Sequence, residues 1–281
     1  MLRKALFFCI MLAGLYFSAF ASGQQPQAVA SDKSTVSTAP NSANIAKLTT
    51  GISEAYYRPE ALAGIDCSVV VDWEPFMTAL KVDMTSDEGK RELGLLRGLK
   101  VHSHAMRGRP AELTFDWSAG PPDSRDQIEG GLRQTIAGFY QSYWGFFDMA
   151  EIKPSDVTRV EPHADSTSTL YVGDSNTNLT VDVDKEGTPT HYKIGTPALN
   201  ATIDLSYVPS DPPAPGDARR ISEARIVQYL GESTVKVNMK LDYQPADTFF
   251  VPRHVSFDIP GSLSMGFEFS SCLPTKKTAA K

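Results

Sequence analysis

Apolar and polar residues alternate along most of the second half of the chain, and this alternation limits the possible folds more than any other feature. Nine successive segments share the pattern: 157–162, 167–172, 178–184, 190–196, 201–207, 219–228, 234–243, 250–258 and 262–269. Side chains of a strand point to opposite faces in turn, so a period of two indicates strands with one apolar face. Short turns between the segments favour an antiparallel meander, because parallel strands need long crossovers.

The first half of the chain adds strands and helices. Alternation predicts strands over residues 67–73, 100–106 and 112–117, and helical spacing predicts helices over 46–57, 74–80, 85–96 and 125–149. A capping box, Thr85 to Glu88, marks the start of the third helix. We expect an α+β fold: a strongly curved antiparallel sheet, a half-barrel-like meander, with helices packed on its concave face.

The helix over residues 125–149 is unusually aromatic. Its rings cover far more than the apolar stripe of about 100° that a surface helix needs. Two interpretations stay open, because cores and ligand pockets have the same composition: the rings fill a wide core, or some of them line a cavity for an acyl chain or other apolar ligand. The candidate lining residues on this helix and the strands are Phe139, Tyr140, Tyr143, Trp144, Phe147, Met239 and Phe267.

The N-terminus resembles an export signal. A basic start, an apolar run and the small-x-small site at Ala19 to Ala21 predict a signal peptide over residues 1–21, although the run is close to the roughly 18 residues of a membrane anchor. Residues 22–43 have the composition of a flexible linker and residues 274–281 that of a disordered tail, which leaves 44–273 as a single α+β domain. We expect a periplasmic or secreted protein with no transmembrane span in the mature chain.

Two cysteines remain after the signal, Cys67 and Cys272. An oxidising compartment favours a disulfide between them, closing a loop of about 200 residues worth roughly 5 kcal/mol in chain entropy. The alternative, a reactive thiol pair, lacks both a Cys-x-x-Cys spacing and a neighbouring cation.

Charge and motifs exclude several functions. The net charge is −6 and becomes more negative when Arg3 and Lys4 leave with the signal, which argues against nucleic acid as the main partner.

His102 and His104 share a strand face, which is a usable spacing for two metal ligands. Zinc needs a third ligand, which is not identifiable nearby, so we expect polar-face histidines and no metal. Asp182 and Asp184 fit a solvated strand face better than glycoside chemistry. With no recognisable nucleophile–base motif, we expect neither a catalytic site nor a cofactor.

The order of these elements resembles that of the bacterial outer-membrane lipoprotein-carrier superfamily, the LolA/LolB-like half-barrels. The resemblance covers most of residues 44–273 as architecture. A sequence pattern near the C-terminus is similar to one seen in such sheets: Leu241-Asp242-Tyr243 followed by Val251-Pro252-Arg253-His254-Val255. It implies that lipid or acyl chains bind in a concave apolar pocket without catalysis. The two cysteines and the long aromatic helix depart from the family pattern.

The sequence therefore predicts an exported, soluble, non-catalytic protein that binds a lipid or other apolar ligand in the cell envelope. The alternative is an envelope structural or interaction module, in which an exposed sheet edge pairs with a partner strand. The sequence identifies neither the ligand nor a protein partner.

Overall fold

The computed structural model describes residues 42–55, 57–118, 120, 122–149, 151–173, 178–196, 200–208, 219–231 and 233–277. The expected signal peptide lies outside these residues, as does nearly all of the expected linker. The chain forms two compact units. Among the described residues, the first unit comprises 59–145 and 237–277, and the second comprises 42–58 and 146–236.

The strands follow one another in a single antiparallel order, β3-β2-β1-β12-β11-β10-β9-β8-β7-β6-β5-β4. The α+β class and the antiparallel meander are thus confirmed. The strong curvature is not, because the sheet is neither closed nor strongly curled. Among the described strands the order begins at β3 and ends at β4, so these two are edge strands. Alternation encodes which face of a strand is apolar, but it carries no measure of how far neighbouring strands twist or coil.

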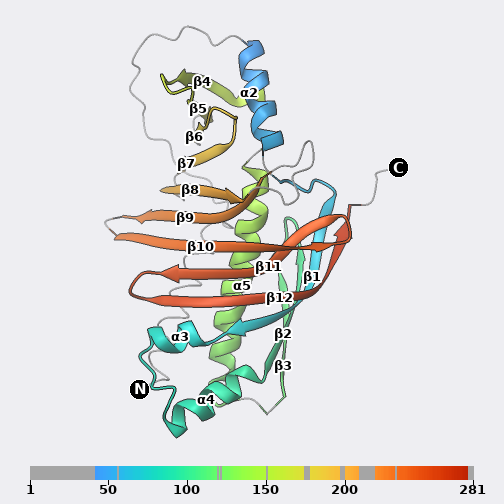
Figure 1. Ribbon diagram of the computed structural model, residues 1–281, viewed down its shortest axis with the longest axis vertical. Helices are drawn as coiled ribbons and strands as arrows, with labels where there is room; N and C mark the ends of the chain where they lie inside the picture. The colour runs from blue at the N-terminus through green and yellow to red at the C-terminus, as the bar shows by residue number, and fades with distance from the viewer. Residues whose placement is uncertain are drawn as a thin grey trace. The chain divides into compact units, whose positions relative to one another are not determined.

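The first unit holds the early strands and the last ones (Figure 1). Its strands are β1 (Leu62–Asp72), β2 (Leu99–Met106), β3 (Glu112–Trp117), most of β10 (Ser233–Ala246), β11 (Phe249–Ile259) and β12 (Leu263–Lys276). Its helices are α3 (Glu74–Ala79), α4 (Asp87–Arg97) and most of α5 (Arg125–Asp148). α4 begins one residue later than the predicted capping box, because the side chain of Ser86, not Thr85, accepts the Gly89 N–H.

The core of the first unit forms where α5 packs on one face of these strands. The buried strand residues on this face alternate with polar ones and include Val69, Val71, Val101, Phe257, Phe267 and Phe269. The register places Val69 opposite Phe269 and Val71 opposite Phe267. From α5, the ring of Phe139 reaches both Phe257 and Phe269. Each fully buried apolar side chain of this kind contributes about 1.5–3 kcal/mol, so this face holds the unit together.

The second unit contains the meander β4 (Val157–Pro162), β5 (Ser168–Gly173), β6 (Asn178–Val183), β7 (Pro189–Gly195), β8 (Asn200–Val208) and β9 (Arg220–Leu230). It also contains α2 (Ser42–Ala55), which packs against the 3-10 turn η2 (Pro154–Asp156). Backbone hydrogen bonds from Arg219 to Ala55 and from Tyr57 to Arg219 fasten the end of α2 to the start of β9.

Two boundaries differ from expectation. β12 continues to Lys276, so Pro274–Lys276 pair with Ile65–Leu62 of β1 where a tail was expected to begin. Ser42 and Ala43, expected in the linker, belong to α2. Composition suggested flexibility at both places, but a neighbouring partner segment orders residues that have little apolar character of their own. Among the described residues, no helix has the length and apolar character needed to cross a membrane.

Candidate functional site

The structure buries every residue proposed to line an apolar cavity. Phe139, Tyr140, Tyr143, Trp144, Phe147, Met239 and Phe267 are each at most 4% exposed. Four of them, Phe139 to Trp144 on α5, form a continuous set of ring contacts with centroids 5.1–5.8 Å apart. Phe267 joins the same cluster through Phe257, whose ring centroid lies 6.0 Å away. These contacts are those of a packed core, and a ligand cavity among these rings stays a prediction.

Phe147 belongs to the second unit, apart from the other proposed lining residues. Its ring lies edge-on to that of Tyr57, with centroids 6.4 Å apart. Met239 lies opposite Phe257 in the β10–β11 ladder and is fully buried. The sequence could not separate these residues, because one helix contributes to both units and its periodicity continues across the division.

Tyr140 brings a hydrogen-bonded hydroxyl group into the aromatic cluster. Its hydroxyl hydrogen bonds to Ser103 Oγ on β2 at 2.9 Å, deep in the first unit. Burial raises the pKa of Tyr140 well above its ordinary value, although the Ser103 hydrogen bond opposes the shift. The phenol is therefore neutral at physiological pH and fixes the rotation of α5 against β2.

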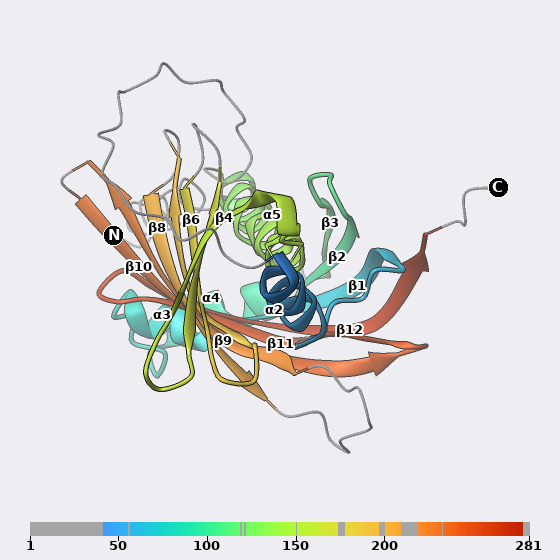
Figure 2. The same ribbon diagram turned by 90° about the horizontal axis from the view of Figure 1, so that it is seen from above.

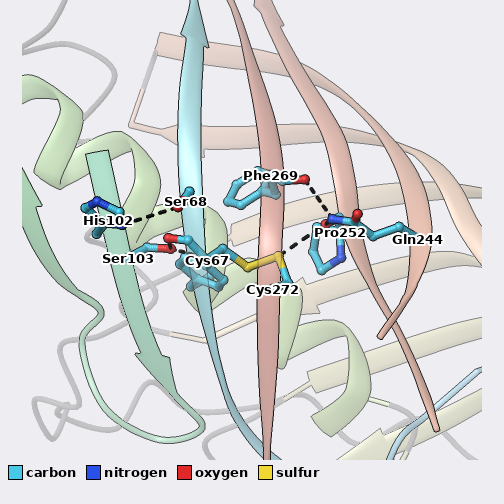
Figure 3. The surroundings of a disulfide bond; sticks show 9 residues. Cys67, Ser68, His102, Ser103, Gln244, Pro252, Phe269 and Cys272 are labelled. Atoms are coloured by element: carbon cyan, nitrogen blue, oxygen red, sulfur yellow. Dashed lines mark hydrogen bonds between the residues drawn. A yellow bond between two sulfur atoms is a disulfide. The ribbon is translucent and has the colours of Figure 1, made fainter. Parts of the chain in front are cut away.

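Cys67 and Cys272 form the expected disulfide, which joins β1 to β12 (Figure 3). Between Asp66 and Ser68 the register shifts, so Ser271 and Cys272 lie where regular pairing has one residue. Ser271 takes a positive φ of 51° at this bulge. The extra residue turns Cys272 to the face on which Cys67 is buried, and without the bulge the two sulfur atoms would lie on opposite faces.

Gln244 supports the bulge from β10. Its side-chain N–H group donates to the carbonyl oxygen of Phe269 at 2.7 Å and to that of Pro252 at 3.1 Å, and it lies 3.6 Å from Cys272 Sγ (Figure 3). The register also shifts beside it, at Asp242 and Tyr243. One amide thus satisfies carbonyl groups at two ladder irregularities.

His102 and His104 both lie on the solvent face of β2, as their spacing predicts. His104 contacts the Asp66 carboxylate at 2.6 Å and His102 contacts Ser68 Oγ at 3.3 Å, so each histidine has a separate partner on β1. A shallow hollow of about 360 Å³ covers this surface. Within the described residues, no three His, Cys, Asp or Glu side chains are grouped closely enough to hold a metal ion.

The carboxylates of the second unit have structural partners. Asp182 accepts a hydrogen bond from Thr169 Oγ1 at 2.6 Å, and Asp184 accepts the backbone N–H groups of Glu186 and Thr188 in the β6–β7 turn. Arg219 lies over the same turn, 2.9 Å from Glu186 Oε2 and 3.5 Å from Asp184 Oδ2. These contacts hold the turn rather than a reacting group.

A groove lies between the edge strand β3 and one face of α5, and we call it the β3–α5 groove. Both views show the β2–β3 hairpin beside α5 (Figure 1 and Figure 2). The groove has a volume of about 610 Å³. Its strand wall consists of Ala111 and the first three residues of β3, Glu112, Leu113 and Thr114. Its helix wall consists of Arg133, Gln134, Ala137, Gly138 and Gln141 on α5. Because the helix residues recur at intervals of three and four, the groove follows a single face of the helix.

Arg133 joins the two walls of the groove. Its Nη1 donates to the carbonyl oxygen of Leu113 at 2.7 Å, and its guanidinium lies over the Phe115 ring, 4.6 Å from the centroid. The Leu113 carbonyl therefore points away from β2, toward the open edge. Since alternate residues of a strand turn their main-chain groups the same way, those of Phe115 face this edge too.

Glu129 anchors β3 at its other end. It accepts hydrogen bonds from Trp117 Nε1 at 3.0 Å and from Arg125 Nε at 2.7 Å, and Arg133 lies 3.8 Å away. Partial burial alone would raise the pKa of Glu129, but the hydrogen bonds from Arg125 and Trp117 and the charges of both arginines lower it below its ordinary value. The carboxylate is thus ionised when β3 is docked on the helix.

Sequence reasoning missed this groove. The sequence predicted a ligand site from the aromatic residues of α5. The groove depends instead on the small residues Ala137 and Gly138 and on Arg133, which has no sequence context that distinguishes it from other surface arginines. A usable signal was present: small and polar residues recur at helical spacing along one face of the same helix that carries the aromatic cluster.

In comparisons with known proteins, no family model, no curated protein and no solved structure matches this chain.

Proposed function

We propose that this protein is a non-catalytic interaction module that binds an extended polypeptide segment in the β3–α5 groove. The observation that carries the proposal is the groove itself, about 610 Å³ between the open edge of a strand and one face of a helix. A peptide placed there adds a strand to the sheet, takes its affinity from main-chain hydrogen bonds and takes its specificity from alternate side chains.

Rigid walls support this function. β3 is fixed to α5 at its C-terminal end by the hydrogen bond from Trp117 Nε1 to Glu129. The helix wall is fixed in turn by its buried aromatic face, of which Phe139 and Tyr140 are each 1% exposed. A site held in place on both sides loses little conformational freedom when a ligand binds, which favours affinity. The Cys67–Cys272 disulfide in the same unit is consistent with an exported protein.

An apolar ligand is the second candidate, as the sequence predicts. It is favoured by the lining of the same groove, where Leu113, Ala111 and Ala137 contribute apolar surface. A fatty acid would then lie along the helix face with its carboxylate near Arg133. Both candidates are binding functions without catalysis, and they differ in whether the main-chain groups of β3 take part.

A bulky substitution that blocks the groove tests this proposal. Ala137→Trp places a large ring in it, and Gln127→Trp is the matched control, because Gln127 is an exposed position of α5 that does not line the groove. Peptides selected from a displayed random library on the wild-type protein should bind Ala137→Trp roughly tenfold more weakly and Gln127→Trp unchanged, as measured by fluorescence anisotropy.

A dansyl-labelled fatty acid is measured in parallel on the same three proteins. If only the fatty acid binds, and Ala137→Trp abolishes that binding, the ligand is apolar and the peptide proposal is overturned. If neither peptides nor fatty acid bind the wild-type protein in a manner sensitive to Ala137→Trp, the groove is not a binding site.

A further inference from the structure

The solvent face of the β1–β2–β3 sheet carries an ordered row of charge that ends at the β3 edge. The residues of β2 on this face are Lys100, His102 and His104, and they lie opposite Asp116, Thr114 and Glu112 of β3. All six are exposed. The row therefore has two carboxylates on β3, Glu112 and Asp116, and one lysine with two imidazoles on β2.

From this pattern, and resting on the proposed function, we infer that the segment added to β3 is basic, with Lys or Arg at alternate positions on its solvent face. Side chains directly opposite one another in paired strands have Cβ atoms about 4.5–5.5 Å apart, close enough for opposite charges to attract and like charges to repel. β2 faces Glu112 and Asp116 from one side only. A strand on the other side continues the charge order of the sheet when it presents cations to these two carboxylates.

The other face of the added strand lies toward the helix. There it meets the wall formed by Gln134, Ala137 and Gly138, where small residues leave room for side chains of modest size. The partner is thus an extended segment in which basic residues alternate with small apolar ones. The main-chain N–H and C=O groups of Leu113 and Phe115 form the hydrogen bonds to the added strand. A main-chain N–H of the partner takes the place of the Arg133 side chain as the donor to the Leu113 carbonyl oxygen.

The same charges disfavour a second copy of this chain as the occupant. In the symmetric antiparallel register centred on Thr114, Glu112 of one copy faces Asp116 of the other, and both ends of the pairing bring like charges together. Charged residues on an edge are a usual means of preventing self-association of sheets. Pairing between the β3 edges of two copies is therefore disfavoured, whereas pairing of β3 with a basic strand is favoured.

The experiment uses three synthetic heptapeptides that alternate valine with lysine, glutamine or glutamate, and the full mature chain. Affinity is measured by fluorescence anisotropy at low and high salt, and hydrogen exchange of the β3 amides reports strand pairing. We expect the lysine peptide to bind best and the glutamate peptide worst. The difference should shrink with salt, because exposed charges are screened.

Charge reversal supplies the decisive variant. Glu112→Lys with Asp116→Lys should weaken the lysine peptide by roughly tenfold and strengthen the glutamate peptide by a similar factor, since two pairs change sign. Glu54→Lys with Glu88→Lys is the control: both are exposed helix residues that do not line the groove, and the net charge changes equally. The control should keep the wild-type order of affinities.

The possible failures are distinct. If all three peptides bind alike and Ala137→Trp abolishes each, the groove binds strands but the charge preference is overturned. If library-selected peptides bind in the groove and the lysine peptide does not, the inference again fails while the proposed function stands. If no peptide of either kind binds, the proposed function fails and the inference fails with it. Concentration-dependent dimers that Glu112→Lys with Asp116→Lys alters in sedimentation would make a second copy the occupant and overturn the inference.

Discussion

The two edge strands, β3 in the first unit and β4 in the second, are protected in different ways. On β4, Arg159 lies 3.7 Å over the Tyr171 ring and 3.3 Å from Glu161, a register shift follows Val157, and Pro162 ends the strand. These are local devices within two neighbouring strands, and all of them oppose further pairing. β3 lacks such a bulge in its ladder with β2, and the side chain that covers its edge, Arg133, comes from a helix.

This difference separates an edge that is closed by its own sequence from an edge that is covered by a movable side chain. A bulge and a proline cannot be displaced by a partner, because they are part of the backbone. An arginine that is about half exposed can rotate away from the edge.

The disulfide should produce the largest effect, confined to the unit that carries β3. Cys67→Ala with Cys272→Ala removes the link between β1 and β12, and we expect a loss of about 2–5 kcal/mol in the free energy of unfolding. Urea unfolding monitored by tryptophan fluorescence measures the loss. Hydrogen exchange should accelerate in β1, β2 and β12 and remain unchanged in β5 and β6. Equal acceleration in both units would show that the two edges share one cooperative unit.

Acid should loosen the anchor of the β3 edge. The pKa of Glu129 is lowered in the folded state, so its stabilising contribution is complete above its ordinary pKa of 4.5 and is lost as the pH falls through the lowered value. Hydrogen exchange of β3, corrected for its intrinsic pH dependence, should show this loss. Glu129→Gln should weaken the β3 anchor by about 1 kcal/mol and make its stability independent of pH in this range. A variant that keeps the acid response of the wild type would assign it to another group.

The smallest effect should come from replacing, one at a time, Arg133 beside β3 and Arg159 on β4 with methionine. Arg133→Met keeps an apolar stem on Phe115 but frees the Leu113 carbonyl, and it should raise the affinity for the lysine–valine peptide by a few-fold. Arg159→Met is the matched change on β4 and should create no peptide binding, because the bulge and Pro162 remain. Binding at β4 in Arg159→Met would show that its arginine, not its backbone, protects that edge.

Much of this fold could be predicted from the sequence. Alternation located the strands closely, down to the bounds of Glu112–Trp117, and the helical spacing located α5. These successes have one cause: the periodicity of a segment records which of its faces is buried, and that is a local property. The disulfide was also predictable, from two cysteines and an oxidising compartment.

The site was not predictable, because it depends on contacts between distant segments. No local pattern shows that Arg133 reaches the carbonyl of Leu113, twenty residues away. Nor does the alternation of β12 show that Ser271 is an extra residue, without which Cys272 would face away from Cys67.

The position of the disulfide also determines how this protein responds to mechanical tension. The two cysteines are 205 residues apart, and the chain between them forms a covalent ring that contains α3, α4, α5 and all strands from β2 to β11. The segments outside the ring include α2, whose end is hydrogen-bonded to Arg219 inside the ring, and residues 62–66, which pair with residues 273–276. Once these contacts have separated, a force applied to the two ends of the chain passes directly from Cys67 to Cys272 and bypasses the ring. From that point the groove between β3 and α5, which lies inside the ring, carries none of the load.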